Sequence, residues 1–162
     1  MTAILSFRPT TNLNANPSRA TSSEADDIRE KFQKFRESLQ QAESLFALPI
    51  RELGDAFLDC RSENWDGYGA QAVPDAAYLQ TKALLSQVLA VFPAPTASAN
   101  PNGSLTLEWF AAPSRRLMVS LNGEQQLAFA GLFGSETVQG TVSFVDDFPL
   151  ELFWHLKRLY YR

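Results

Sequence analysis

The residues best suited to chemistry stand together in the segment Glu63–Ala70, which reads ENWDGYGA. It brings two aromatic side chains, an aspartate and two glycines into a short stretch: Trp65, Tyr68, Asp66, Gly67 and Gly69. Aromatic rings can form a stacking platform, and a carboxylate can accept hydrogen bonds from a small polar ligand or a peptide. In this functional interpretation Trp65, Asp66 and Tyr68 are binding residues.

The same segment also has a structural interpretation, in which it is a corner that the fold requires. Glycines adopt positive φ angles at little cost, and an aspartate can accept a hydrogen bond from the backbone N–H two residues further on. Trp65 and Tyr68 would then bury their rings on either side of the corner. Because every residue has a structural use, we expect a corner, with ligand binding as the alternative.

Nucleophilic catalysis finds little support in the rest of the chain. It needs a nucleophile with a positioned base, most often histidine, and His155 is the only histidine. The single cysteine, Cys60, lies among acidic residues, which raise the pKa of a thiol. One histidine and one cysteine are too few for a zinc site of those ligands. We therefore predict no catalytic residues, no metal site and no cofactor.

Acidic residues are concentrated between residues 24 and 66, where eleven acidic and six basic side chains give a net charge of −5. Such a surface can steer a basic partner and add specificity. We expect a non-enzymatic interaction protein that binds a basic protein, of the antitoxin, immunity or defence-interference kind. Asp55, Asp59 and Glu63 join the binding residues of the corner. A carboxylate-dependent enzyme that uses Asp66 with Asp59 or Glu63 is the alternative.

Composition excludes further classes of function. The net charge of −4 argues against direct binding of nucleic acid, which requires a basic face. No apolar run reaches the roughly 18 residues that cross a bilayer, so we expect no membrane contact. A single cysteine fits a reducing compartment, and we predict a cytoplasmic protein. Residues 1–22 have the composition of a flexible tail, and residues 23–162 form one domain.

An apolar stripe marks the first predicted helix, which begins near Thr21. Its members recur at alternating steps of four and three: Ile28, Phe32, Phe35, Leu39, Ala42 and Phe46. Such a stripe packs on the protein's own core or docks a partner. We expect it to form a homodimer or partner contact through Phe32, Phe35, Leu39 and Phe46. A second, short helix is predicted over Ile50–Cys60.

The rest of the chain predicts an α+β fold. A helix follows Pro74, the segment 92–103 is a proline-rich connection, and a last helix spans Leu150–Tyr161. About four strands lie between them: 104–110, 116–121, about 125–133 and 140–145. Asn122-Gly123 predicts a two-residue hairpin. We therefore expect an antiparallel meander with helices on one face, between N-terminal helices and a C-terminal helix.

Two stretches resemble a group of small uncharacterised bacterial proteins that have a WDGYGA element and a later PxG…LEW strand. The first is Asn64–Ala70, with Pro74 opening the next helix, and the second is Pro101–Trp109, PNGSLTLEW. The resemblance covers residues 62–160 and leaves out the tail and the first helix. It supports the fold boundary and implies no particular activity.

Overall fold

The computed structural model describes residues 19–145 and 147–161, so most of the expected tail lies outside it. The chain divides into two compact units, one ending at Gln40 and the other beginning at Gln41, and each is described by itself. Across the described residues, no helix is both long and apolar enough to cross a membrane.

The first helix, α1, runs without interruption over Arg19–Cys60. The predicted pair of helices, with a break before Ile50, is therefore wrong. Pro49 lies inside α1 and lacks the N–H that would bond to the carbonyl of Leu45, but the helix continues past it. Three buried side chains beyond the proline, Leu53, Phe57 and Cys60, belong to the core and hold this part of the helix.

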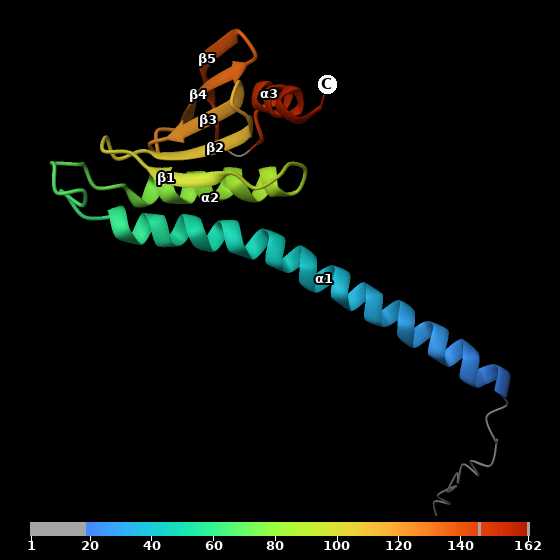
Figure 1. Ribbon diagram of the computed structural model, residues 1–162. Helices are drawn as coiled ribbons and strands as arrows, with labels where there is room; N and C mark the ends of the chain where they lie inside the picture. The colour runs from blue at the N-terminus through green and yellow to red at the C-terminus, as the bar shows by residue number, and fades with distance from the viewer. Residues whose placement is uncertain (1–18, 146, 162) are drawn as a thin grey trace, which may run out of the picture. The chain divides into compact units, whose positions relative to one another are not determined.

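An antiparallel meander of five strands forms the sheet, and its strands follow one another in sequence order (Figure 1). The strands are β1 (Thr96–Ala99), β2 (Leu105–Ala112), β3 (Arg115–Leu121), β4 (Gln126–Phe133) and β5 (Glu136–Ser143). The α+β class, the meander and the flanking helices are as predicted from the sequence.

Strand β1 was missed in the proline-rich connection. It pairs with β2 from Thr96 opposite Glu108 to Ala99 opposite Leu105. Prolines on either side exclude a helix, but they allow a short strand at the edge of a sheet, where one row of backbone groups needs no partner. The β3–β4 connection also differs from the expected two-residue hairpin, because it spans residues 122–125 and contains positive φ angles at Gly123 and Gln125.

Helices α2 (Asp75–Leu89) and α3 (Leu150–Tyr160) cover one face of the sheet (Figure 1). Alternate strand residues point into the layer between them: Leu105, Leu107, Trp109, Leu117, Val119, Leu121, Leu127, Phe129 and Phe133. Leu84 and Leu85 of α2 and Leu152 and Leu156 of α3 complete this core. The opposite face of β3 and β4 carries the alternate residues, among them the exposed Met118 and Ala130.

The end of α1 packs on α2 and so adds a third layer. The rings of Phe57 and Tyr78 stack with centroids 4.5 Å apart. Gly54 lies next to the same tyrosine, since a Cβ atom added there would be 3.6 Å from its hydroxyl oxygen. The corner Glu63–Ala70 follows directly on the end of α1 and leads into α2.

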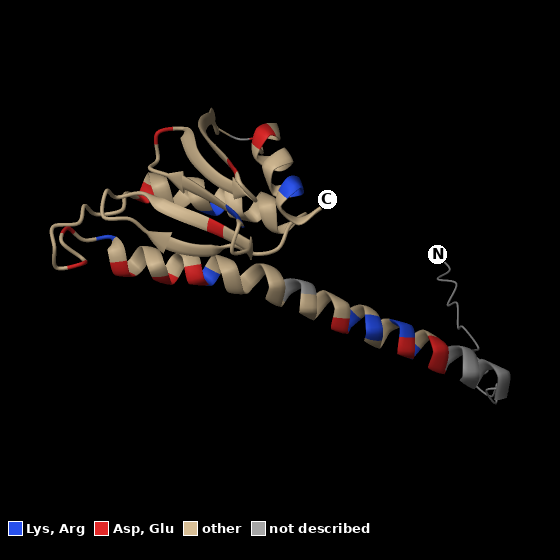
Figure 2. Ribbon diagram, turned by 45° about the horizontal axis from the view of Figure 1, so that its top comes forward, with Lys and Arg blue, Asp and Glu red and all other residues tan. Residues whose placement is uncertain are grey.

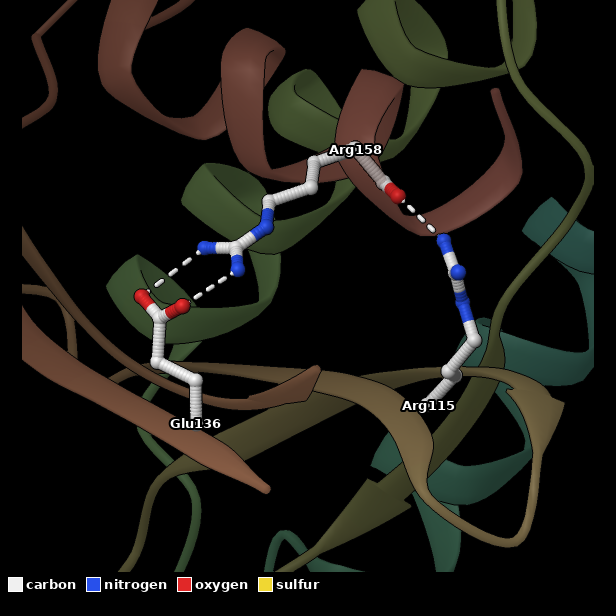
Figure 3. A network of polar contacts seen from close by, with 3 residues as sticks. All are labelled: Arg115, Glu136 and Arg158. Carbon is white, nitrogen blue, oxygen red and sulfur yellow. Dashed lines mark hydrogen bonds and ion pairs between the residues drawn. The ribbon is translucent and has the colours of Figure 1, made fainter. Parts of the chain in front are cut away.

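Two arginines join α3 to the sheet (Figure 3). Arg158 of α3 donates to both carboxylate oxygens of Glu136 on β5, at 3.0 and 2.5 Å. Arg115 of β3 donates to the carbonyl oxygen of Leu159 at 2.7 Å and to that of Arg158. These carbonyls belong to the last turn of α3, which has no further helical N–H groups to bond to.

Candidate functional site

The corner turns by means of three residues with positive φ angles: Asn64 at 60°, Gly67 at 76° and Gly69 at 95°. A Cβ atom at Gly67 or Gly69 would meet no atom within 4 Å, so backbone conformation rather than space explains the glycines. A positive φ angle was predicted from the sequence for both glycines but not for Asn64, although asparagine is among the residue types that tolerate left-handed backbone angles.

Side chains of the corner bind its own backbone. Asp66 Oδ1 accepts hydrogen bonds from the N–H groups of Tyr68, at 2.8 Å, and Ala70, at 3.1 Å. Asn64 Oδ1 accepts from Gly69 N–H at 2.7 Å. The bond from Tyr68 N–H is the main reason that the pKa of Asp66 lies below its ordinary value. The carboxylate is thus occupied in stabilising the turn, as the structural interpretation expects.

Further bonds tie the corner to the rest of its unit. The indole N–H of Trp65 donates to the carbonyl of Gln71 at 3.0 Å, and its half-buried ring packs against the core. Gln71 N–H donates to the carbonyl of Pro101, and Val73 N–H donates to that of Cys60. The corner therefore connects the end of α1 with the β1–β2 turn.

Tyr68 does not bury its ring in the corner, as the structural interpretation expected, because its side chain is 95% exposed. Only Trp65 packs against the core, so the two aromatic residues have different surroundings. Tyr68 remains open to a ligand or a partner. Its role in binding, like that of Trp65 and Asp66, stays a prediction.

The three remaining predicted binding residues, Asp55, Asp59 and Glu63, are all exposed. Asp55 and Asp59 are one helical turn apart near the end of α1, where acidic residues predominate (Figure 2). Arg51 approaches Asp55 at 3.8 Å. Within the described ranges, no group of three or more His, Cys, Asp or Glu side chains is placed to hold a metal ion.

Cys60 and His155 both lie in packed surroundings. Burial raises the pKa of the Cys60 thiol, and the negative charge of Asp59 raises it further, so the reactive thiolate is disfavoured. His155 lies against the rings of Phe129 and Phe133, with centroids 5.0 and 5.9 Å away. Neither arrangement provides a nucleophile with a base.

The first unit exposes large apolar side chains along one side of α1. We call these four residues the seam: Ile28, Phe32, Phe35 and Leu39, which are 55%, 68%, 60% and 48% exposed. Of the other predicted members of the stripe, Phe46 is 39% exposed and belongs to the second unit, and the side chain of Ala42 lies outside the described set. Among the side chains that the structure describes in this unit, the seam forms a continuous apolar row.

A polar hollow of about 170 Å³ lies on the second unit and was not expected from the sequence. Its lining includes Ser104, Ser120, Glu124 and Thr141. A hydrogen-bond chain supports it, because the Asn100 amide donates to Ser104 and Thr106, and Thr106 bonds to Ser120 at 2.6 Å. The hollow is smaller than the roughly 300–1,000 Å³ of most ligand pockets.

Comparisons of the chain with protein-family models, with curated proteins and with solved structures found no match. The resemblance of the WDGYGA and LEW segments to small bacterial proteins stays a prediction.

Proposed function

We propose that this chain is a non-enzymatic interaction protein that binds a protein partner through the seam of α1. The observation that supports this most is the exposure of four large apolar side chains in one row. Soluble proteins rarely leave apolar residues in a contiguous patch unless the patch meets a partner. A helix that presents such a row every three or four residues has the geometry of a docking helix.

The seam can anchor a complex but needs support from other contacts. Burying a whole Leu, Ile or Phe side chain contributes about 1.5–3 kcal/mol, and about half of each seam side chain is exposed. Four such residues therefore supply about 3–6 kcal/mol before the costs of association. Micromolar binding requires about 8 kcal/mol. The apolar side chains that the partner buries in the same contact must therefore supply the rest.

The acidic surface of the second unit supports binding of a basic protein partner, which is the mode of action we propose for a protein of the antitoxin, immunity or defence-interference kind. We define this surface as Asp55, Asp59 and Glu63, all exposed. Charges of this kind act mainly on the association rate and are screened beyond about 8–10 Å at ordinary salt. In this proposal the acidic surface guides the encounter.

Affinity capture with matched variants tests the seam. The variant Phe32→Glu/Phe35→Glu places two charges on the seam, and Gln33→Glu/Gln40→Glu places two on the same helix away from it. We expect a stoichiometric partner to be retained by the wild type and the control but lost by the seam variant. Equal retention by the seam variant, or capture of no partner by the wild type from the host, contradicts the proposal.

Charge reversal tests the acidic surface separately. We expect Asp55→Lys/Asp59→Lys/Glu63→Lys to slow association with the captured partner and to flatten its dependence on salt. The fold should survive, because surface substitutions usually change stability by less than about 0.5 kcal/mol each. An association rate that equals the wild-type rate at both low and high salt excludes steering by this surface.

A further inference from the structure

The residues that flank the seam are mostly cationic. In a heptad that places Phe32 at position a and Phe35 at position d, Glu24 and Glu43 occupy the g and e positions just outside the two ends of the seam, and the e and g positions along it are Arg29, Lys31, Arg36 and Ser38. Three of these four carry a positive charge. In helix pairs the e and g side chains of one helix meet those of the other, so they select the partner and its orientation.

The acidic residues of this part of α1 lie on the other side of the helix. Asp26, Asp27, Glu30 and Glu37 occupy positions b, c and f of the same heptad. Asp26 pairs with Arg29 at 3.1 Å, and Glu30 pairs with Lys34 at 2.7 Å. Neither Lys31 nor Arg36 forms an ion pair with any residue that the structure describes. Two cations beside the seam are thus available to a partner.

We propose that the seam docks a partner helix whose own apolar row is flanked by acidic side chains. This inference rests on the proposed function and specifies the chemistry of its partner. Glutamates at the e and g positions of that helix would meet Lys31, Arg36 and Arg29 while its apolar row packs on Phe32 and Phe35. Charge pairs at these positions set partner choice, and the apolar contacts supply most of the affinity.

A second copy of the chain fits the seam less well than an acidic helix. In a parallel pair, the g residue of one helix faces the next e residue of the other, which places Lys31 against Arg36 on both sides. In an antiparallel pair that matches the seam with itself, e faces e and g faces g, so Arg29 meets Arg36 of the other helix while Lys31 meets Ser38. Both orientations bring like charges together. The homodimer expected from the stripe is therefore the less favourable occupant.

An anionic membrane surface also fits the seam less well. Helices that lie in a membrane interface have a broad apolar face and a polar face rich in lysine and arginine. The seam is the narrow row of a and d positions only, and the polar side of the helix carries four acidic residues. Those acids would be repelled by anionic lipids. The spacing and the charges together favour a helical protein partner.

Two synthetic helices test this inference on the full chain. Each is about four heptads long, long enough to be helical when paired, with Ile at a and Leu at d. One carries Glu at every e and g position, and the other carries Lys there. Binding is followed by fluorescence anisotropy of the labelled peptide. We expect the Glu-flanked peptide to bind at least about tenfold more tightly than the Lys-flanked peptide, a difference of about 1.4 kcal/mol.

Charge reversal on the chain provides the matched control. The variant Arg29→Glu/Lys31→Glu/Arg36→Glu keeps good helix formers at each position, and circular dichroism checks that its helix content is unchanged. This variant should bind the Lys-flanked peptide more tightly than the Glu-flanked peptide, which reverses the preference of the wild type. The variant Phe32→Glu/Phe35→Glu should bind neither peptide.

Four outcomes overturn the inference. They are equal binding of the two peptides by the wild type, binding of neither, self-association through the seam in sedimentation analysis, and co-sedimentation with phosphatidylserine-containing vesicles in place of peptide binding. A natural partner that is lost from the Phe32→Glu/Phe35→Glu variant would still support docking at the seam. A failure of the expected preference for an acid-flanked helix is thereby distinguished from a failure of the proposed function.

Discussion

The loop between β3 and β4 offers a matched test of how the sheet meets α2. Gly123 in this loop has a φ of 91°, and a Cβ atom added there would lie 2.9 Å from Ala76 Cβ and 3.0 Å from Ala77 N. Both atoms belong to the first turn of α2. Gly134, in the loop between β4 and β5, has a φ of 75°, but an added Cβ would meet no atom within 4 Å. The two glycines therefore share the conformational requirement and differ in the space around them.

Alanine at either position adopts an unfavourable backbone conformation, at a cost of about 1–2 kcal/mol. At Gly123 the added methyl group also displaces the backbone of α2, and overpacking of this kind costs about 1–3 kcal/mol more. We therefore expect Gly123→Ala to reduce the free energy of unfolding by about 2–5 kcal/mol and Gly134→Ala by about 1–2 kcal/mol. The midpoint of thermal unfolding should fall by about 2–4 °C for each kcal/mol in a protein of this size.

Urea denaturation of both variants, followed by circular dichroism, measures the difference. The slope of the free energy of unfolding against urea concentration should equal that of the wild type, because both variants should expose the same surface when they unfold. If the two variants differ from each other by less than about 0.5 kcal/mol, the loop does not rest on α2. That result would refute the packing of the β3–β4 loop against the first turn of the helix.

Three further predictions concern single side chains. Arg115→Met should lower the free energy of unfolding by about 1 kcal/mol and speed amide hydrogen exchange in the last turn of α3, because the carbonyls of Arg158 and Leu159 lose their hydrogen-bond donor. The control Arg116→Met, on the exposed surface of β3, should change neither quantity much. The pKa of Asp66 is lowered in the folded state, so its contribution to stability is present above the unfolded pKa and is lost as pH falls through the folded pKa. The thermal midpoint of Asp66→Asn should therefore depend less on pH below about pH 4 than the midpoint of the wild type. If the midpoints of the two proteins change equally with pH, Asp66 does not have this role. Cys60 should react with iodoacetamide much more slowly at neutral pH in the native protein than in urea, because burial and Asp59 raise the pKa of its thiol, and equal rates would show that the thiol is accessible.

Local patterns were enough to predict the turn chemistry of the corner. Gly67 and Gly69 have positive φ angles, and Asp66 accepts from the N–H two residues further on. These features depend on backbone angles and bonds within a few residues, so residue types alone indicate them. The alternation of apolar residues in β2, β3 and β4 was likewise sufficient for the meander, because each strand has one buried face.

Features that depend on distant segments could not be predicted in this way. Trp65 and Tyr68 are similar residues in the same corner, but only Trp65 lies where the core offers a surface. Strand β1 forms by pairing with the edge of β2. The prolines on either side of it made this segment look like a connection without a strand. The helix α1 continues through Pro49 because buried residues beyond the proline hold it to the core.

The seam illustrates the difference between what a sequence pattern predicts and what depends on tertiary contacts. The sequence alone established the spacing of the seam and the charges beside it, because a helical period places side chains on one face wherever the helix lies. It left open whether the protein's own core covers that face. Exposure is a tertiary property, since burial depends on which other segments reach the helix, and within the first unit, taken by itself, Ile28, Phe32, Phe35 and Leu39 are exposed.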